Sequence, residues 1–136
     1  MQYNTQTPPE LVISLHACDT ATDIVLEKAS AWRAKVILST PCCHHELNHT
    51  LNCAQLGFIS EHSMLRQKFC DAATDALRLK LLEAKGYKCE ALELIDPEET
   101  PKNILLRAVL AERQNTGAKE RAMAEYRAAR QFLLGR

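Results

Sequence analysis

Glycine, proline and aromatic residues are scarce in this sequence. The 136 residues include four glycines and five prolines, and aromatic side chains make up 5% of the chain. This excludes a collagen-like or low-complexity chain, because both classes depend on glycine and proline. The glycines stand alone, at positions 57, 86, 117 and 135. The sequence therefore also lacks the glycine-rich turn with which many α/β proteins approach a nucleotide cofactor.

An excess of charge and a long apolar run are missing as well. Seventeen basic side chains balance seventeen acidic ones, so the whole chain projects no strong field towards nucleic acid or an anionic membrane. No apolar run reaches the ~20 residues that cross a bilayer, and Met1–Glu10 contains no apolar signal segment. We therefore expect a cytoplasmic protein with no membrane partner.

The residues that are present are sufficient for one folded domain. Hydrophobic residues make up 46% of the chain and charged residues 25%, which is the balance of a soluble globular protein. A chain of this length buries about two-thirds of the surface that it exposes when unfolded. Six cysteines without a signal segment indicate reduced thiols rather than a disulfide framework. We expect a single domain over residues 1–136.

The first part of the chain predicts a strand, a helix and a second strand. Leu11–Ala17 and Lys35–Thr40 are short apolar runs rich in β-branched residues, a pattern typical of parallel strands buried on both faces. Thr20 and Asp23 have the spacing of a capping box, which begins a helix that we expect to reach Arg33. The expected apolar face of this helix comprises Ala21, Val25, Ala29 and Trp32. Such a β-α-β unit is right-handed and brings both strand ends to one sheet edge.

The rest of the chain predicts a long helix, two strands and a closing helix. The long helix is expected between an N-cap at Ser60 and a stop at Gly86. Its predicted buried side comprises Leu65, Phe69, Ala72, Ala76 and Leu79. An antiparallel pair of strands follows and then an amphipathic helix, the predicted ranges being Tyr87–Ile95, Asn103–Leu110 and Ala118–Leu134. Asp96–Lys102 has turn chemistry, and Met123, Tyr126 and Leu133 are expected to face inward from the last helix.

The clearest motifs follow the two predicted parallel strands. LHACDTATD begins at Leu15, and PCCHHEL begins at Pro41. Together they resemble a bacterial methyltransferase-domain family and its eukaryotic relatives, the tRNA 2′-O-methyltransferases. The likeness extends from about Pro9 to Leu134 and implies an S-adenosylmethionine-dependent methyltransferase whose acceptor is RNA.

The resemblance implies a partial Rossmann-like α/β methyltransferase fold. The four predicted strands would be equivalent to strands four to seven of a seven-stranded sheet, with the last strand inserted antiparallel to the others. The glycine-rich half that grips S-adenosylmethionine in such enzymes is absent from the 136 residues. We expect that half to be a partner of this chain. Without it, the open edge of the first strand is expected to support a homodimer.

The resemblance also implies a methyl-transfer site at the ends of the parallel strands. In the family, the first motif lies against the methionine and adenine parts of the cofactor, which assigns cofactor contacts to Leu15, His16 and Ala17. The implied catalytic residues of the two motifs are His16, Cys18, Asp19, Cys42, Cys43, His44 and His45. Because an imidazole is the usual proton acceptor near neutral pH, His44 or His45 is expected to take a proton from the acceptor.

Structural roles for the first motif stay open at this point. Capping a helix could be the sole role of Thr20 and Asp23, and Asp19 could serve in the same cap. His16 and Cys18 could be packed side chains where an apolar strand ends. The whole chain could also be a noncatalytic interaction or regulatory module of methyltransferase ancestry.

Two other chemical uses of the cysteines also stay open. Cys42, His45, His49 and Cys53 have a spacing that tetrahedral zinc could use, and three of them would share a face if residues 48–53 are helical. We nevertheless expect no metal. Cys18 and Cys42 also stand at the strand ends from which pyrimidine C5-methyltransferases direct a covalent nucleophile.

Overall fold

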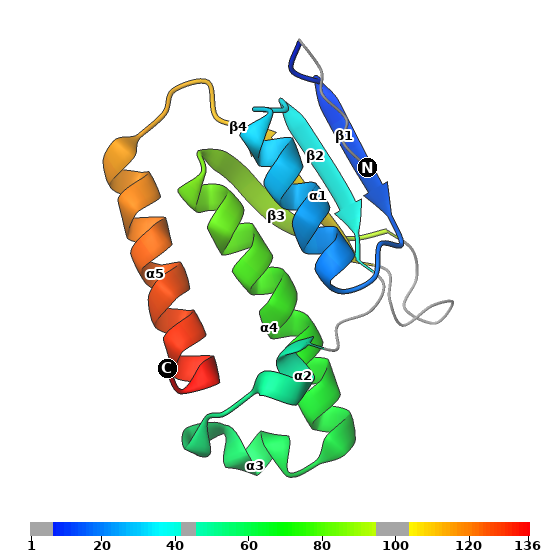
Figure 1. The fold of residues 1–136 in the computed structure, drawn as a ribbon, viewed down its shortest axis with the longest axis vertical. Helices are drawn as coiled ribbons and strands as arrows, with labels where there is room; N and C mark the ends of the chain where they lie inside the picture. Colours follow the sequence, from blue (N-terminus) through cyan, green and yellow to red (C-terminus); the bar gives the residue numbers. More distant parts are fainter. Residues whose placement is uncertain (1–6, 42–45, 95–103) are drawn as a thin grey trace.

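The computed structural model describes residues 7–41, 46–94 and 104–136. Figure 1 shows the strands behind three long helices. In chain order the elements are β1 (Leu11–Leu15), α1 (Thr20–Ala31), β2 (Val36–Thr40), α2 (Glu46–Thr50), the 3₁₀ helix η1 (Ala54–Leu56), α3 (Gly57–Ser60), α4 (Ser63–Ala84), β3 (Tyr87–Glu93), β4 (Ile104–Leu110) and α5 (Thr116–Leu134). None of the helices in these three ranges is long and apolar enough to span a membrane.

The strands form one mixed sheet in the order β1-β2-β4-β3. β1 and β2 are parallel, and β4 is antiparallel to both of its neighbours. The last strand is antiparallel to its neighbours, as the family resemblance implies, and it lies between β2 and β3. This mixed α/β fold is compatible with a partial Rossmann-like methyltransferase sheet.

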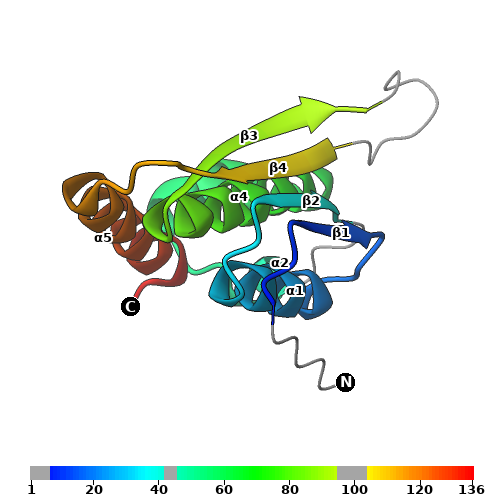
Figure 2. The same ribbon diagram turned by 90° about the horizontal axis from the view of Figure 1, so that it is seen from above.

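The helices cover one face of the sheet and leave the other bare in the described part of the chain (Figure 2). The strand register aligns Val12, Ile37, Ala108 and Cys89 across the covered face. These residues belong to or pack against the main core, whose buried members are Leu26, Ala29, Ala34, Ile37, Leu82, Tyr87 and Ala108. α1 and α4 each connect two strands and lie on the same side, so a single face is buried.

The expectation that both parallel strands are buried on both faces is therefore wrong. The side chains of Leu11, Ile13 and Leu15 point away from the helices and are 50%, 54% and 65% exposed. Within the described residues β1 is an edge strand rather than a central one. Continuous apolar runs predict two covered faces, but covering the second face needs elements that these residues do not provide.

A second, smaller core lies beyond the end of the sheet. The 22 residues of α4 span about 33 Å, whereas a seven-residue strand spans about 23 Å. The far end of α4 therefore packs against α2 and α5, where Leu47, Cys70 and Leu133 are buried. This helical end places α2 and α5 close to the edge at which β1 and β2 end.

The structure corrects the predicted course of α4. Ser60 belongs to the short helix α3, and the residue before α4 is His62. The residues that α4 buries are Cys70, Asp75, Arg78 and Leu82, whereas three of the residues predicted for its buried side, Leu65, Ala72 and Ala76, are exposed. A search for apolar positions misses this face because two of its members are charged and neutralise each other. The predicted stop is confirmed, since Gly86 has a left-handed φ of 98°.

The predicted capping box of α1 is wrong, and of its predicted apolar face only Ala29 is buried, while Val25 and Trp32 are half-buried. Asp19 is the N-cap residue and makes no side-chain cap bond. The buried residues are Thr22, Leu26, Ala29 and Ser30, and Ala21 is exposed. Two polar residues can be buried here because their hydroxyls donate to backbone oxygens: Thr22 Oγ1 to Ala17 O at 2.8 Å and Ser30 Oγ to Glu27 O at 2.9 Å.

The C-terminal part follows the prediction closely. β3 ends at Glu93, while Asp96–Lys102 and Asn103 lie outside the described residues. α5 starts two residues earlier than expected, because the Oδ1 atom of Asn115 accepts the amide of Ala118 at 3.0 Å and caps the helix. The side chains that were expected to face inward, Met123, Tyr126 and Leu133, are half-buried or buried.

Alkaline pH is expected to destabilise the protein through Cys89 on the covered face. Burial, and secondly the Glu83 carboxylate, raise the pKa of the Cys89 thiol to about 12 from its ordinary value of 9.0. The unfolded chain loses this proton first, so stability is retained below pH 9 and is lost as the pH rises from about 9 towards 12. We expect urea unfolding to show a larger loss of stability from pH 8 to pH 10 in the parent than in Cys89→Val. An equal loss in both proteins would show that the thiol does not govern it.

Candidate active site

The two motif segments leave the sheet at the same edge. Leu15 lies opposite Thr40 in the parallel register of β1 and β2. The amide of His16 donates to the carbonyl oxygen of Thr40 at 3.0 Å and approaches its hydroxyl at 3.2 Å. The start of the first motif is thereby fixed to the residue that precedes Pro41 and the second motif.

The first motif turns sharply between β1 and α1. His16 and Asp19 have left-handed φ values of 53° and 44°, a conformation that costs a residue other than glycine about 1–2 kcal/mol. Hydrogen bonds hold the turn: Thr22 Oγ1 donates to Ala17 O at 2.8 Å, and the amide of Thr22 donates to Asp19 O at 3.1 Å. The strained backbone turns the side chains of the motif out of the core.

The side chains of this turn are accessible. His16 and Cys18 are exposed, Ala17 and Asp19 are half-buried, and Leu15 is 65% exposed on the bare face of the sheet. The structural alternative of a packed histidine and a buried thiol is therefore wrong. All five residues are available to a ligand. Their assignment to a cofactor and methyl-transfer site stays a prediction.

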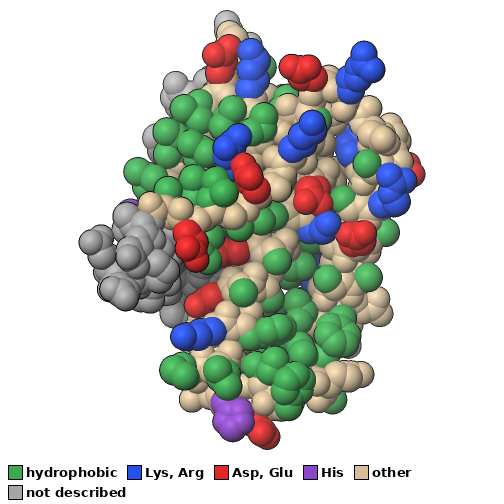
Figure 3. Space-filling view, turned by 180° about the vertical axis from the view of Figure 1, so that it is seen from behind, with side chains coloured by type: hydrophobic (Ala, Val, Ile, Leu, Met, Phe, Trp, Pro, Cys, Tyr) green, Lys and Arg blue, Asp and Glu red, His purple; other side chains and the backbone are tan. Residues whose placement is uncertain are grey.

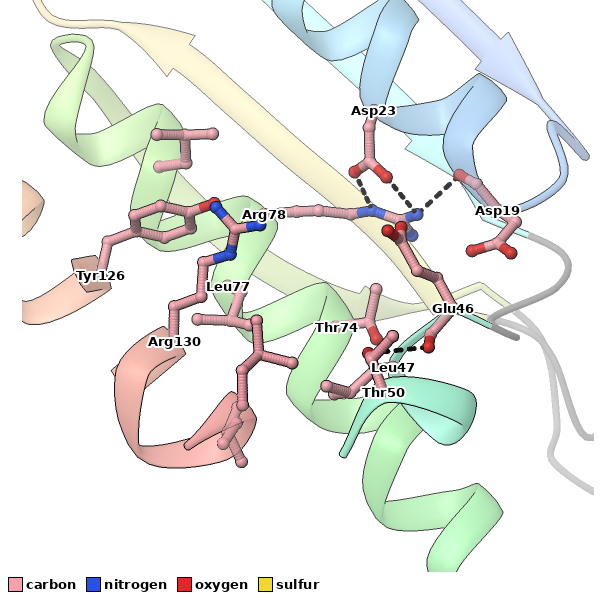
Figure 4. A pocket seen from close by; sticks show the side chains of 13 residues that line it. Asp19, Asp23, Glu46, Leu47, Thr50, Thr74, Leu77, Arg78, Tyr126 and Arg130 are labelled. Atoms are coloured by element: carbon pink, nitrogen blue, oxygen red, sulfur yellow. Dashed lines mark hydrogen bonds and ion pairs between the residues drawn. The ribbon is translucent and has the colours of Figure 1, made fainter. Parts of the chain in front are cut away.

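The sequence analysis missed Arg78, which holds this turn from behind. Its guanidinium donates to both carboxylate oxygens of Asp23 at 2.7 and 3.4 Å, to Asp75 at 3.1 Å and to the carbonyl oxygen of Asp19 at 2.8 Å. The side chains of Arg78 and Asp75 are 4% and 8% exposed. Figure 4 shows the guanidinium reaching from α4 to the N-terminal end of α1. The sequence carries only a weak signal for this network, because Asp75 and Arg78 are opposite charges three residues apart, as are Lys80 and Glu83 on the same helix.

A hollow of about 210 Å³ opens beside this ion-pair network, between α1, α2, α4 and α5. Asp19, Asp23 and Glu46 line it at the end near the motifs, and Tyr126 and Arg130 line it on the side of α5 (Figure 4). Ligand sites for drug-sized molecules usually measure about 300–1,000 Å³. The hollow is thus too small to enclose a nucleoside cofactor by itself.

The central part of the second motif, Cys42, Cys43, His44 and His45, lies outside the described residues. Its two flanks are described: β2 ends at Thr40, and Glu46 begins α2. Because Glu46 and Asp19 line the same hollow, the flanks of the second motif come close to the first. The predicted catalytic roles of the four central residues remain predictions.

Residues 48–53 do not form one continuous helix, so the condition under which three of the candidate zinc ligands would share a helical face is not met. α2 ends at Thr50, and Cys53 follows in an extended conformation with φ −141° and ψ 108°. The thiol of Cys53 lies 3.3 Å from the side-chain oxygen of Gln55. No three His, Cys, Asp or Glu side chains within residues 7–41, 46–94 and 104–136 are arranged to hold a metal ion. Two of the four candidate ligands, Cys42 and His45, lie outside these ranges.

Comparison with known proteins places a family match on this part of the chain. A family model described as a methyltransferase domain matches residues 1–50. The match spans β1, α1 and β2, both motifs, and α2. Searches of the curated proteins and of the solved structures returned no match. The family match supports a methyltransferase domain and a methyltransferase-like function, and such domains generally use S-adenosylmethionine.

Proposed function

We propose that this chain forms the C-terminal part of the catalytic domain of an S-adenosylmethionine-dependent methyltransferase that acts on RNA. The observation that carries the proposal is the meeting of the two motif segments at one edge of the β1–β2 pair. The methyltransferase-domain match covers both segments. Open α/β sheets bind their ligands at this edge, beyond the carboxyl ends of parallel strands.

The chemistry asks little of the protein beyond alignment and proton removal. Bound S-adenosylmethionine would supply an electrophilic methyl group for transfer to an acceptor oxygen, with the thioether as the leaving group. Leu15, His16 and Ala17 would form the wall against the cofactor, and Cys18 and Asp19 would face the acceptor. His44 or His45 would receive the acceptor proton, because an imidazole is partly unprotonated near neutral pH.

RNA is proposed as the acceptor because both motifs resemble those of tRNA 2′-O-methyltransferases. With zero net charge the chain has no excess of positive charge to attract RNA, and tight binding of RNA normally needs several phosphate contacts from lysine and arginine. The glycine-rich half would therefore have to contribute to RNA binding as well as to cofactor binding. A ribose hydroxyl is a weak nucleophile, which is consistent with a histidine-rich motif beside it.

We expect the chain as printed to bind S-adenosylmethionine very weakly. In such folds the ribose and the amino-acid tail of the cofactor are held mainly by a glycine-rich turn and by an acidic residue on the following strand. The four isolated glycines provide no such turn. Titration calorimetry should therefore detect no binding at micromolar concentrations, and a micromolar dissociation constant would contradict the expected division of the site.

The acceptor is tested with the polypeptide as its natural gene encodes it. Tritium-labelled S-adenosylmethionine and total RNA are incubated with this protein, and the labelled fraction is digested with ribonuclease or protease. Label released by ribonuclease alone supports the proposal. Label released by protease points to a protein acceptor, and the absence of label favours the noncatalytic module.

A further inference from the structure

The outer edge of β1 carries unpaired backbone groups in the described chain. The amide of Val36 donates to Glu10 O at 2.9 Å, and the amide of His16 donates to Thr40 O at 3.0 Å. In a parallel pair, the residues that bond to the neighbouring strand alternate with residues that point away from it. Leu11, Ile13 and Leu15 therefore direct both their N–H and their C=O groups to the outer edge, where β1 has no neighbour in the sheet.

Nothing in β1 blocks the addition of another strand. Exposed edges are usually protected by lysine, proline or a bulge, and the sequence LVISL contains none of these. The side chains of the three outward-bonding residues form an exposed apolar row on the bare face of the sheet. Figure 3 shows hydrophobic side chains gathered on this face of the molecule.

α1 adds an apolar flank, on the covered face of the sheet, next to the outer edge of β1. Asp23 faces α4 through its ion pair with Arg78. At 100° per residue, Ala21, Val25 and Trp32 lie about half a turn from Asp23, on the side of α1 that is turned towards the outer edge of β1. Ala21 is exposed, and Val25 and Trp32 are half-buried. This is the face that the sequence predicted to be apolar, and the structure leaves part of it uncovered.

We propose that a second copy of this chain occupies the edge, with the two β1 strands antiparallel about a two-fold axis at Ile13. Ile13 then lies opposite Ile13 of the partner subunit, and Leu11 lies opposite the partner's Leu15. All three residues point both backbone groups outward, so each opposing pair exchanges both of its N–H···O=C bonds. Shifting one β1 strand by two residues against the other would leave two of the three hydrogen-bonded pairs. The register centred on Ile13 is therefore the most favourable one.

Charge and packing agree with the same arrangement. In this register Glu10 and the exposed His16 of the partner subunit flank the same end of the paired strands. Glu10 already pairs with Lys35 at 3.0 Å, and its carboxylate also attracts a protonated imidazole. An axis perpendicular to the sheet keeps both α1 helices on one face and turns their apolar flanks towards each other. This second contact matters because stable interfaces bury about 800 Å² per partner, more than two short strands provide. The dimer does not require methyl-transfer activity, but it uses the edge of β1 that the glycine-rich half of the proposed enzyme would cover, so it is expected of the chain as printed.

Light scattering after size-exclusion chromatography tests the dimer over a tenfold concentration range that reaches high micromolar. We expect the parent to have twice the mass of the chain. Ile13→Lys and Ile13→Pro should each raise the dissociation constant of the dimer at least tenfold. Lysine places two ammonium groups across the axis at a side chain that is 54% exposed, so the fold is preserved. Proline removes an outward amide without removing a bond to β2. The control Leu92→Lys changes an exposed apolar residue of β3, at the far edge of the sheet, and should dimerise like the parent.

Amide hydrogen exchange identifies the surface that is used. The amides of Val12 and Ser14, which face β2, should be protected at every concentration, whereas those of Leu11, Ile13 and Leu15 should gain protection only as the dimer forms. A monomeric mass throughout would overturn the proposal, and so would a dimer that Ile13→Pro leaves intact. Protection of the three outward amides in a monomer would show that another segment of the same polypeptide covers the edge, which also overturns it.

Discussion

Replacing Arg78 with alanine is expected to lower the free energy of unfolding by about 3–5 kcal/mol, the usual effect of removing one partner of a buried ion pair. Asp75 would be left as a buried carboxylate that is 8% exposed, and Asp23 and the carbonyl oxygen of Asp19 would lose their donor. Urea unfolding at neutral pH measures the change. Because Arg78 connects α4 to the start of α1, the turn that carries the first motif should lose amide protection as well.

Two variants make this expectation specific. Lys80→Ala removes another ion-paired cation of α4, but this lysine is 33% exposed, so the cost should be about 1 kcal/mol or less. The double variant Arg78→Met with Asp75→Leu leaves no unpaired buried charge between these two positions and should recover most of the lost stability. An Arg78→Ala protein as stable as Lys80→Ala would show that the network does not stabilise the fold.

Replacing both His44 and His45 with alanine in the complete enzyme is expected to lower the turnover number for methyl transfer about 10²–10⁴-fold, the typical contribution of a general base. The affinity for S-adenosylmethionine should change less than about twofold. The reason is that both residues belong to the second motif, which follows β2 in the sequence and which the proposed function assigns to the acceptor. Single-turnover transfer and calorimetry of the same protein preparation measure the two quantities separately.

The pH profile distinguishes a base from a residue that only shapes the loop. If an imidazole accepts the proton, the rate of the parent should rise with pH through about 6.5, the ordinary pKa of histidine, and the double variant should lose this rise. His62→Ala is the matched control, since its imidazole is 60% exposed beside Glu61, just before α4. Equal turnover in the double variant and the parent would remove both histidines from the mechanism.

The sequence by itself determined the order of the elements and the place of the motifs. Apolar runs located β1 and β2, the left-handed Gly86 ended α4 as predicted, and the antiparallel insertion of β4 followed from the family resemblance. These features depend on neighbours in the chain or on backbone conformation, and both leave a local signal in the sequence. The strand-end location of His16–Asp19 was therefore predictable, because a parallel pair connected by a helix must end at one edge.

Only the tertiary structure decided which side of α1 and of α4 is buried and what holds the first motif. Arg78 lies 55 residues from Asp23, and no periodicity in either segment indicates that the two form an ion pair. Charged residues on the inner face of α4 contradict an apolar pattern, but Arg78 is buried because distant groups at Asp19 and Asp23 accept its hydrogen bonds. The hydroxyls on the inner face of α1 are buried because they donate to nearby backbone oxygens. The bare face of the sheet could not be predicted from the sequence either. A local pattern shows that a strand is apolar, but the three-dimensional arrangement of the helices determines which of its faces is covered.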